Sequence, residues 1–234
     1  MWWIAEFEAV TLFSLKMSTA TATGGKTLLV PTPYALKMAL LDGACRVRGV
    51  EQARTLWPQI RDLGIGISPA KIAVVNNLFQ KVLRPRRRQI PFDQPDAGPF
   101  QKTIGYREYV HLLGPLSFAF GWAEDNERPW LKDLLQNIHY LGKRGGFMQL
   151  LDQPKRVRDL PPRFINASEE QAMFAINGTL QILDDCASTL TFEKANVYSG
   201  ESIRMGRERI TRNVVLPYRM VRSSRSFTLY QRID

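Results

Sequence analysis

The feature that most constrains the fold is a polar excursion, residues 81–107, between two apolar runs that read as strands. Prolines lack a backbone N–H and oppose a regular sheet. The excursion contains four of them: Pro85, Pro91, Pro95 and Pro99. A long connection without helical periodicity is uncommon inside a domain unless it serves a function. The segment therefore predicts a projecting hairpin or arm rather than a core element.

The same excursion concentrates positive charge. Two acids oppose seven basic residues, for a net charge of +5; the basic residues are Lys81, Arg84, Arg86, Arg87, Arg88, Lys102 and Arg107. Residues 201–234 carry another +5, so the two segments account for the whole formal charge of +10. A neutral body with two cationic surfaces suits phosphate groups, which release counterions when basic side chains neutralise them. We therefore expect a nucleic-acid binder, with RNA as the ligand.

The length, hydropathy and cysteine content of the chain exclude several other classes of protein. The 234 residues allow one large domain or two small ones with a substantial core. No apolar run approaches the roughly 18 residues that indicate a membrane span, and the first residues do not read as a secretory signal. Cys45 and Cys186 lie far apart without metal-ligand spacing and predict buried, reduced thiols. The expected compartment is the cytoplasm, with no cofactor and no metal.

Strand and helix patterns alternate along the chain. Expected strands cover residues 3–15, 71–83, 109–120 and 147–151. Expected helices begin at Pro33 after a Thr32 N-cap and end at Gly43, and also cover residues 50–63 and 128–141. This βαββαβ order predicts an α+β fold with a ferredoxin-like or RRM-like sheet in residues 1–160. Residues 161–234 read as a β-rich C-terminal extension, either a small second domain or added core.

Other candidate sites keep two interpretations open. The loop 16–26 ends at Lys26 and reads as a flexible connector or as backbone that approaches a ligand. The turn 142–146 combines Lys143 and Arg144 with glycines and suits a sugar–phosphate backbone. Near the C-terminus, arginines that include Arg222 and Arg225 alternate with aromatic residues. One interpretation is an RNA-binding surface of cations and stacking aromatic rings. The other is the outer face of a strand whose aromatic side chains lie in the core.

Catalytic patterns are weak. His111 and His139 have no nucleophile or metal ligand nearby in the sequence, so packed or surface histidines are expected. Asp184 and Asp185 are adjacent without a third ligand and predict a turn or an exposed pair. The sequence contains no Walker-type, HExxH, GxSxG or CxxC motif.

Several of these motifs occur in an order that resembles a known family. A glycine loop leads into VPTPYALKMALL, a basic arm leads into Arg107-Glu-Tyr-Val110, and a helix ends in Tyr140-Leu-Gly-Lys-Arg144. This order is similar to the fifth family of CRISPR-associated proteins. These are the RAMP-fold subunits that cap the 5′ handle of the crRNA in type I Cascade complexes. The resemblance covers about the first 150 residues, and the C-terminal part matches only in its β-rich character.

The resemblance implies roles for individual residues. Residues 81–107 would be the thumb hairpin that kinks the crRNA at the first spacer nucleotides and packs against the neighbouring backbone subunit. A handle-binding groove would contain Lys26, Tyr34, Lys37, Lys143 and Arg144. The implied partners are the crRNA, the backbone RAMP subunit, the large subunit and, through the complex, target DNA.

Two further functions stay open at this stage. One subgroup of the family cleaves pre-crRNA without metal through a Tyr/Lys/His site, for which Tyr34, Lys37 and His111 are the nearest candidates. The basic residue that adjoins the family's catalytic histidine is absent beside His111, whose neighbours are Val110 and Leu112. We therefore expect a non-catalytic subunit. The other possibility is a structural protein whose basic arm binds an acidic protein.

Overall fold

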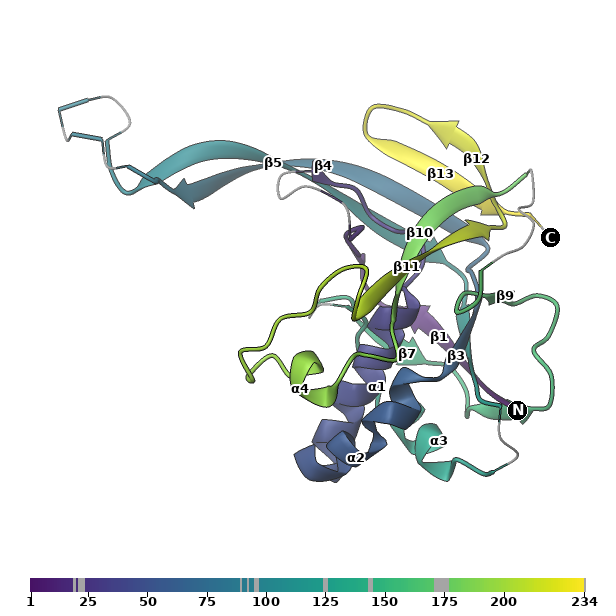
Figure 1. Ribbon diagram of the computed structural model, residues 1–234. Coiled ribbons are helices and arrows are strands. Elements are labelled where there is room, and N and C mark those ends of the chain that lie inside the picture. Colours follow the sequence, from purple (N-terminus) through teal and green to yellow (C-terminus); the bar gives the residue numbers. More distant parts are fainter. Residues whose placement is uncertain are drawn as a thin grey trace.

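The structure is a computed structural model. It describes residues 1–18, 20, 24–88, 90–91, 93–94, 97–123, 126–142, 145–170 and 177–233. The chain forms a mixed α+β body from which a long two-stranded arm projects (Figure 1). Nearly all strand pairs are antiparallel.

The helices and strands are numbered in chain order. The helices are α1 (Pro33–Arg48), α2 (Val50–Arg61), α3 (Pro129–Gln136) and α4 (Phe192–Ala195). The strands are β1 (Trp2–Ala9), β2 (Gly24–Gly25), β3 (Gly64–Ser68), β4 (Ile72–Pro85), β5 (Phe100–Leu113), β6 (Leu116–Gly121), β7 (Met148–Leu150), β8 (Lys155–Val157), β9 (Ile165–Asn166), β10 (Thr179–Cys186), β11 (Arg209–Leu216), β12 (Tyr218–Ser223) and β13 (Phe227–Arg232).

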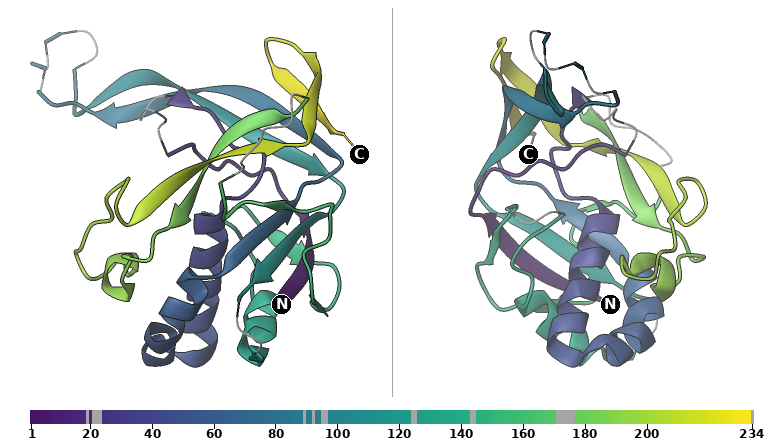
Figure 2. Two further views of the ribbon diagram at one scale, coloured as in Figure 1. Left: turned by 45° about the vertical axis from the view of Figure 1, so that its right-hand side comes forward. Right: turned by 90° about the vertical axis from the view of Figure 1, so that its left-hand side faces the viewer.

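The main sheet has the strand order β7-β1-β6-β3-β9, and β8 also pairs with β1. Alternate residues of a strand point to one face of its sheet, and in β1 this face holds the buried side chains of Ala5 and Phe7. Phe7 packs against Phe118 of β6 with ring centroids 5.8 Å apart. Helix α1 packs against α2 and α3 beside this sheet (Figure 2). Burial of these apolar side chains is the main force that holds the body together.

Helix α1 begins where the sequence predicts and ends later. The Thr32 hydroxyl accepts a hydrogen bond from the backbone N–H of Ala35 at 3.1 Å, and Pro33 follows at the first helical position. The predicted stop at Gly43 is wrong, because the helix continues to Arg48 and ends at Gly49, whose φ is 82°. Gly43 is buried near the Leu134 carbonyl of α3. A helical glycine costs only about 1 kcal/mol, less than the burial of the apolar side chains around it contributes.

The strand that follows the helices also differs from the prediction. The main-sheet strand is β3, whereas residues 72–83 of the predicted strand lie in β4 of a second sheet. The predicted strand 109–120 divides at Gly114, whose φ of 92° turns the chain between β5 and β6. The sequence of β3 is GIGIS, which is short and rich in glycine and so gives little strand signal. Its Gly66 packs closely, because a Cβ there would lie 2.7 Å from the end of the Leu160 side chain and 3.1 Å from the Cβ of Ala119.

The remaining predicted boundaries shift by a few residues. Strand β1 ends at Ala9, while Phe13 forms an isolated bridge to Val110 of β5. Helices α2 and α3 end two and five residues earlier than expected, at Arg61 and Gln136.

The C-terminal strands join both larger sheets and also form a sheet of their own. The second sheet has the order β12-β13-β4-β5-β2, and β10 and β11 form a separate two-stranded sheet. Strand β9 joins the main sheet at β3. The indole N–H of Trp57 in α2 donates to the Leu190 carbonyl at 2.8 Å, which ties the C-terminal part to the helices. Strand β10 lies in the segment 161–234 that the sequence predicts to be β-rich, whereas residues 192–195 of that segment form α4.

Candidate nucleic-acid interface

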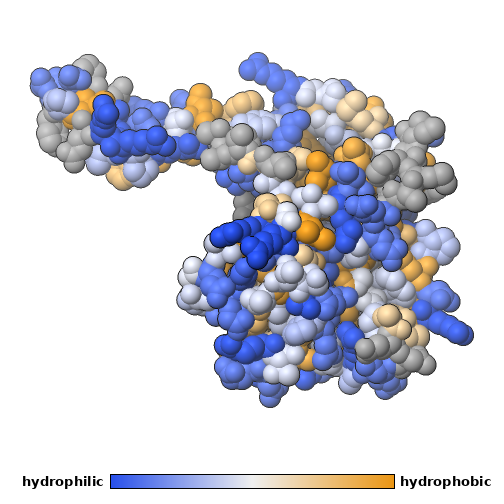
Figure 3. Space-filling model, in the orientation of Figure 1, coloured by the Kyte–Doolittle hydropathy of each residue, from blue (hydrophilic) through white to orange (hydrophobic). Residues whose placement is uncertain are grey.

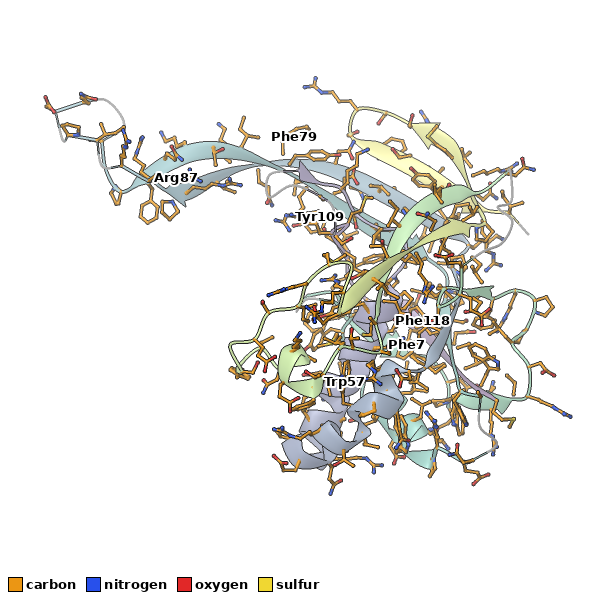
Figure 4. All side chains as sticks on the ribbon, viewed as in Figure 1. Phe7, Trp57, Phe79, Arg87, Tyr109 and Phe118 are labelled. Atoms are coloured by element: carbon orange, nitrogen blue, oxygen red, sulfur yellow. The ribbon has the colours of Figure 1, made fainter. Side chains whose placement is uncertain are left out.

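The arm consists of the outer halves of β4 and β5 and the turn between them. The two strands pair in continuous antiparallel register out to Pro85 and Phe100. Beyond that pair, the backbone N–H of Arg86 donates to the Pro99 carbonyl at 2.8 Å, and its side-chain Nε donates to the Phe100 carbonyl at 3.1 Å. Arg87 lies at the far end of the arm, well away from the body (Figure 4). The described residues of the segment 81–107 therefore lie almost wholly outside the packed body.

The cations of the arm are available to a ligand. Lys81, Arg87, Arg88 and Lys102 are exposed, and Arg84 is half-buried. Within the described part of the chain, none of these five forms an ion pair with a carboxylate. Like charges at this density repel one another, so a polyanion that binds here relieves an unfavourable interaction.

The glycine loop lies along the edge of the arm. Gly24 and Gly25 form β2, which pairs in parallel with Tyr106 and Arg107 of β5. A Cβ at Gly25 would lie 2.6 Å from the Tyr106 carbonyl oxygen, so the close approach that this glycine permits is to the chain's own strand. Lys26 is exposed at the end of β2. Lys26 and Arg107 therefore lie in the same region, at the root of the arm.

A short polar network fixes this root. The Glu108 carboxylate accepts the Thr27 backbone N–H at 2.9 Å and the Tyr106 hydroxyl at 2.6 Å. The Tyr106 hydroxyl also lies 3.1 Å from Oδ1 of Asn77 on β4. Burial and the hydrogen bond to Glu108 raise the pKa of Tyr106 to about 12, so this phenol stays protonated.

The structure does not support a place for Lys37 in an RNA-binding groove. Its ammonium group is buried and lies 2.6 Å from Oδ1 of Asp185, which is equally buried. The prediction of Asp184 and Asp185 as a turn or exposed pair is also wrong, because both lie on β10 and are 3% exposed. Asp184 instead pairs with Arg209 of β11. These two ion pairs join α1 to β10 and β10 to β11.

Tyr34 lines a cavity of about 630 Å³ between α1 and the segment 192–198. The Arg209 guanidinium lies 4.1 Å from the centre of its ring. Burial raises the pKa of Tyr34. Tyr198, another wall residue, is 94% exposed. Sequence reasoning did not single out this cavity, since its walls come from segments that lie far apart in the sequence.

The C-terminal hairpin of β12 and β13 pairs with β4 through residues 72–76, so it flanks the root of the arm. Arg222 is exposed and stacks over Phe227 at 6.0 Å. Arg225 is exposed, and its carbonyl accepts a hydrogen bond from the Asn77 side chain at 3.0 Å. Tyr218, however, is fully buried, and its hydroxyl donates to the Ala70 carbonyl at 2.6 Å. Each of the two interpretations of this segment is therefore partly right. Arg222 and Arg225 lie on the surface, whereas the aromatic side chain of Tyr218 lies in the core.

The remaining candidates are located as follows. Lys143 and Arg144 lie outside the described residues, between Gly142 and Gly145, which have φ angles of 77° and 104°. His111 is exposed on β5 opposite Val74. Tyr34, Lys37 and His111 do not meet in one site, because Lys37 is held by Asp185 and His111 is absent from the cavity that Tyr34 lines.

The cysteines and acidic residues offer no further site. Cys186 is buried and Cys45 half-buried, and both are free thiols. Burial raises the pKa of both, that of Cys186 to about 12. In the described ranges, no three His, Cys, Asp or Glu side chains lie close enough to hold a metal ion. Among the helices of those ranges, none has the length and apolar character needed to span a membrane.

Comparison of the chain with known proteins finds similarity to solved structures only. No family model matches it, and no curated protein matches it. It is similar to a CRISPR protein from Archaeoglobus fulgidus, with a TM-score of 0.49 and 13% identity over 100% of this chain and 92% of that chain. It is also similar to a chain of a CRISPR RNA-guided surveillance complex, with a TM-score of 0.46 and 15% identity over 92% of this chain and 90% of that chain.

Proposed function

We propose that this chain is a non-catalytic crRNA-binding subunit of a type I CRISPR Cascade effector complex. The observation that carries the proposal is the arm, a ribbon that projects from the body with exposed cations that have no carboxylate partner among the described residues. A solvated loop does not need a paired strand framework of this length, whereas a segment that must reach and position a nucleic-acid strand does. In this role, the arm is a thumb that kinks the crRNA.

The topology supports a RAMP ferredoxin-like core. Strand β1, helices α1 and α2, strands β3 and β6, helix α3 and strand β7 follow one another in a βαββαβ order, with the arm inserted between β3 and β6. Their spatial order is β7-β1-β6-β3, and each neighbouring pair is antiparallel. That is the strand arrangement of a ferredoxin-like sheet. We assign the strands after residue 160 to the β-rich extension.

The cations around the root of the arm extend the binding surface toward the body. Lys26 and Arg107 lie at the edge formed by β2 and β5, and Arg222 and Arg225 lie on the hairpin beside β4. We assign this region to the 5′ handle of the crRNA. In the complex, the subunit joins the backbone RAMP subunit to the large subunit and contributes to RNA-guided recognition of target DNA.

The first test is the salt dependence of RNA binding. For single-stranded RNA, log K falls with log salt with a slope of about −0.7 for each phosphate contacted. We expect filter binding of a repeat-derived RNA to show a slope of about −3 or steeper, since at least four arm cations are exposed. A flat response would contradict RNA binding and would favour an acidic protein as the ligand of the arm.

We also propose that the chain does not cleave RNA. Lys37, one of the three candidate catalytic residues, is committed to a buried ion pair, and its ammonium is therefore not free to stabilise a cleaved phosphate. Incubation of the purified protein with repeat RNA in EDTA is expected to leave the RNA intact, for the native chain and for His111→Ala alike. A defined cut that disappears in His111→Ala would establish the alternative, a metal-independent endoribonuclease that processes pre-crRNA.

A further inference from the structure

One carboxylate lies among the cations at the root of the arm. Glu108 is half-buried on β5 next to Arg107, and it hydrogen-bonds the residue that follows Lys26. The described residues of the arm beyond it present a mostly hydrophilic surface, drawn blue in Figure 3. A negative charge at the edge of a phosphate-binding surface opposes binding, since like charges repel. The position of this carboxylate therefore requires an explanation other than direct contact with RNA.

The carboxylate of Glu108 takes its hydrogen bonds from neutral groups. Its Oε2 accepts the backbone N–H of Thr27 at 2.9 Å, and its Oε1 accepts the Tyr106 hydroxyl at 2.6 Å. Within the described ranges, no ion pair joins Glu108 to a lysine or an arginine. The cations at the root therefore keep their charge for a ligand, and Glu108 acts on the backbone that carries them.

Thr27 joins the two ends of the glycine loop. It forms an isolated antiparallel bridge with Lys16, and its hydroxyl accepts the backbone N–H of Leu15 at 3.1 Å. The two lysines of this junction, Lys16 and Lys26, are exposed, whereas Thr27 is buried. Glu108 thus fixes one buried residue and, through it, the backbone of two exposed lysines.

Loss of the Glu108 carboxylate would release this junction. A buried backbone N–H without an acceptor is unfavourable, so the Thr27 amide would turn toward water and draw the loop away from β5. Arg107 depends on the same loop, because a Cβ at Gly25 would lie 3.3 Å from the Cγ of Arg107, whose stem therefore packs against β2. The two lysines and Arg107 would then no longer lie together.

We propose that Glu108 is a positioning residue of the RNA-binding surface, which holds the glycine loop against β5 so that Lys16, Lys26 and Arg107 contact one stretch of phosphates. This inference rests on the proposed function, since RNA must bind at the root of the arm. It adds Lys16 to the binding surface. It also makes the effect of Glu108 opposite in sign to that of its charge, because a carboxylate here strengthens the binding of a polyanion.

Two variants of equal charge separate the effect of position from that of charge. Glu108→Ala removes both hydrogen-bond acceptors. In Glu108→Gln the amide oxygen can still accept the Thr27 N–H, and the NH2 group can donate to the Tyr106 hydroxyl, which itself donates to Oδ1 of Asn77 at 3.1 Å. Each variant raises the formal net charge of +10 by one. Charge alone therefore predicts the same, slightly stronger RNA binding for both.

We expect Glu108→Ala to bind single-stranded RNA about fivefold or more weakly than Glu108→Gln, with a salt slope smaller by about 0.7 to 1.4, the value for one or two lost phosphate contacts. Glu108→Gln should bind at least as tightly as the native chain. Filter binding across a salt series measures both quantities. Hydrogen exchange of the Thr27 amide, which should be faster in Glu108→Ala than in Glu108→Gln, is a readout without RNA. Equal affinity and slope in the two variants would overturn the proposal.

A further variant keeps the test decisive if Glu108→Ala folds poorly. Lys16→Ala with Lys26→Ala changes only exposed side chains, so its melting temperature should stay nearly unchanged. This double variant should lose RNA affinity, and in its background Glu108→Ala and Glu108→Gln should bind RNA nearly equally. Unchanged RNA binding by the double variant would contradict the inference while leaving the proposed function intact. Absence of RNA binding by the native chain would refute the proposed function and the inference with it.

Discussion

Replacing Arg87 and Arg88 by alanine is expected to weaken RNA binding roughly tenfold or more at physiological salt, and to reduce the salt slope by about 1.4. Both side chains are exposed at the tip of the arm, and no carboxylate of the described residues pairs with either. The melting temperature should stay nearly unchanged, because exposed charges contribute little to folding. Filter binding across a salt series and thermal unfolding measure the two effects.

The matched control for this variant removes two exposed arginines elsewhere. Arg158 and Arg163 are exposed, and Arg158→Ala with Arg163→Ala changes the net charge by the same amount. An equal loss of RNA affinity in the control would mean that overall charge, and not the arm, determines binding. Arg86 is left in place in both variants, because its side chain hydrogen-bonds the Phe100 carbonyl and helps to hold the tip.

The largest loss of stability is expected from Lys37→Met. The ammonium of Lys37 is the ion-pair partner of Asp185, and its removal leaves a buried carboxylate without a counter-charge. Breaking a buried ion pair from one side costs about 3–5 kcal/mol, which corresponds to a fall in melting temperature of roughly 10 °C for a chain of this size. Urea and thermal unfolding provide the measurement.

The double variant Lys37→Met with Asp185→Leu distinguishes a buried charge from poor packing. With both charges replaced by apolar groups, most of the lost stability should return. If the double variant is as unstable as the sum of the two single variants, the cost comes from packing at the contact of α1 with β10. Neither replacement lies on the arm, so RNA binding by the folded fraction should not change.

Features with a local cause could be predicted from the sequence. The start of α1 depends on Thr32 and Pro33 alone, and its capping hydrogen bond joins residues only three positions apart. A polar segment at residues 81–107 that leaves the core is likewise apparent from its prolines and its charge. The end of α1 could not be read in the same way, because the role of Gly43 depends on how closely α3 approaches.

Features that depend on distant residues were missed. Strand β3 is a strand because β6 and β9 pair with it, and its own five residues give almost no signal. Lys37 is the more instructive case. It shares the buried stripe of α1 with Leu40, Leu41 and Ala44 at three-, four- and seven-residue spacing, which could have indicated burial. A buried lysine requires a carboxylate, and the one that serves is 148 residues away.

The pairing of the arm has a consequence for the chain outside a complex. Strand β13 covers β4 only along residues 72–76, and β2 covers β5 only at residues 106–107. Further out, the backbone amides and carbonyls along both margins of the ribbon face water, and such open margins invite strand addition by another polypeptide. We therefore expect self-association when the protein is made alone, and suppression of that aggregation when it is made together with the partners proposed above.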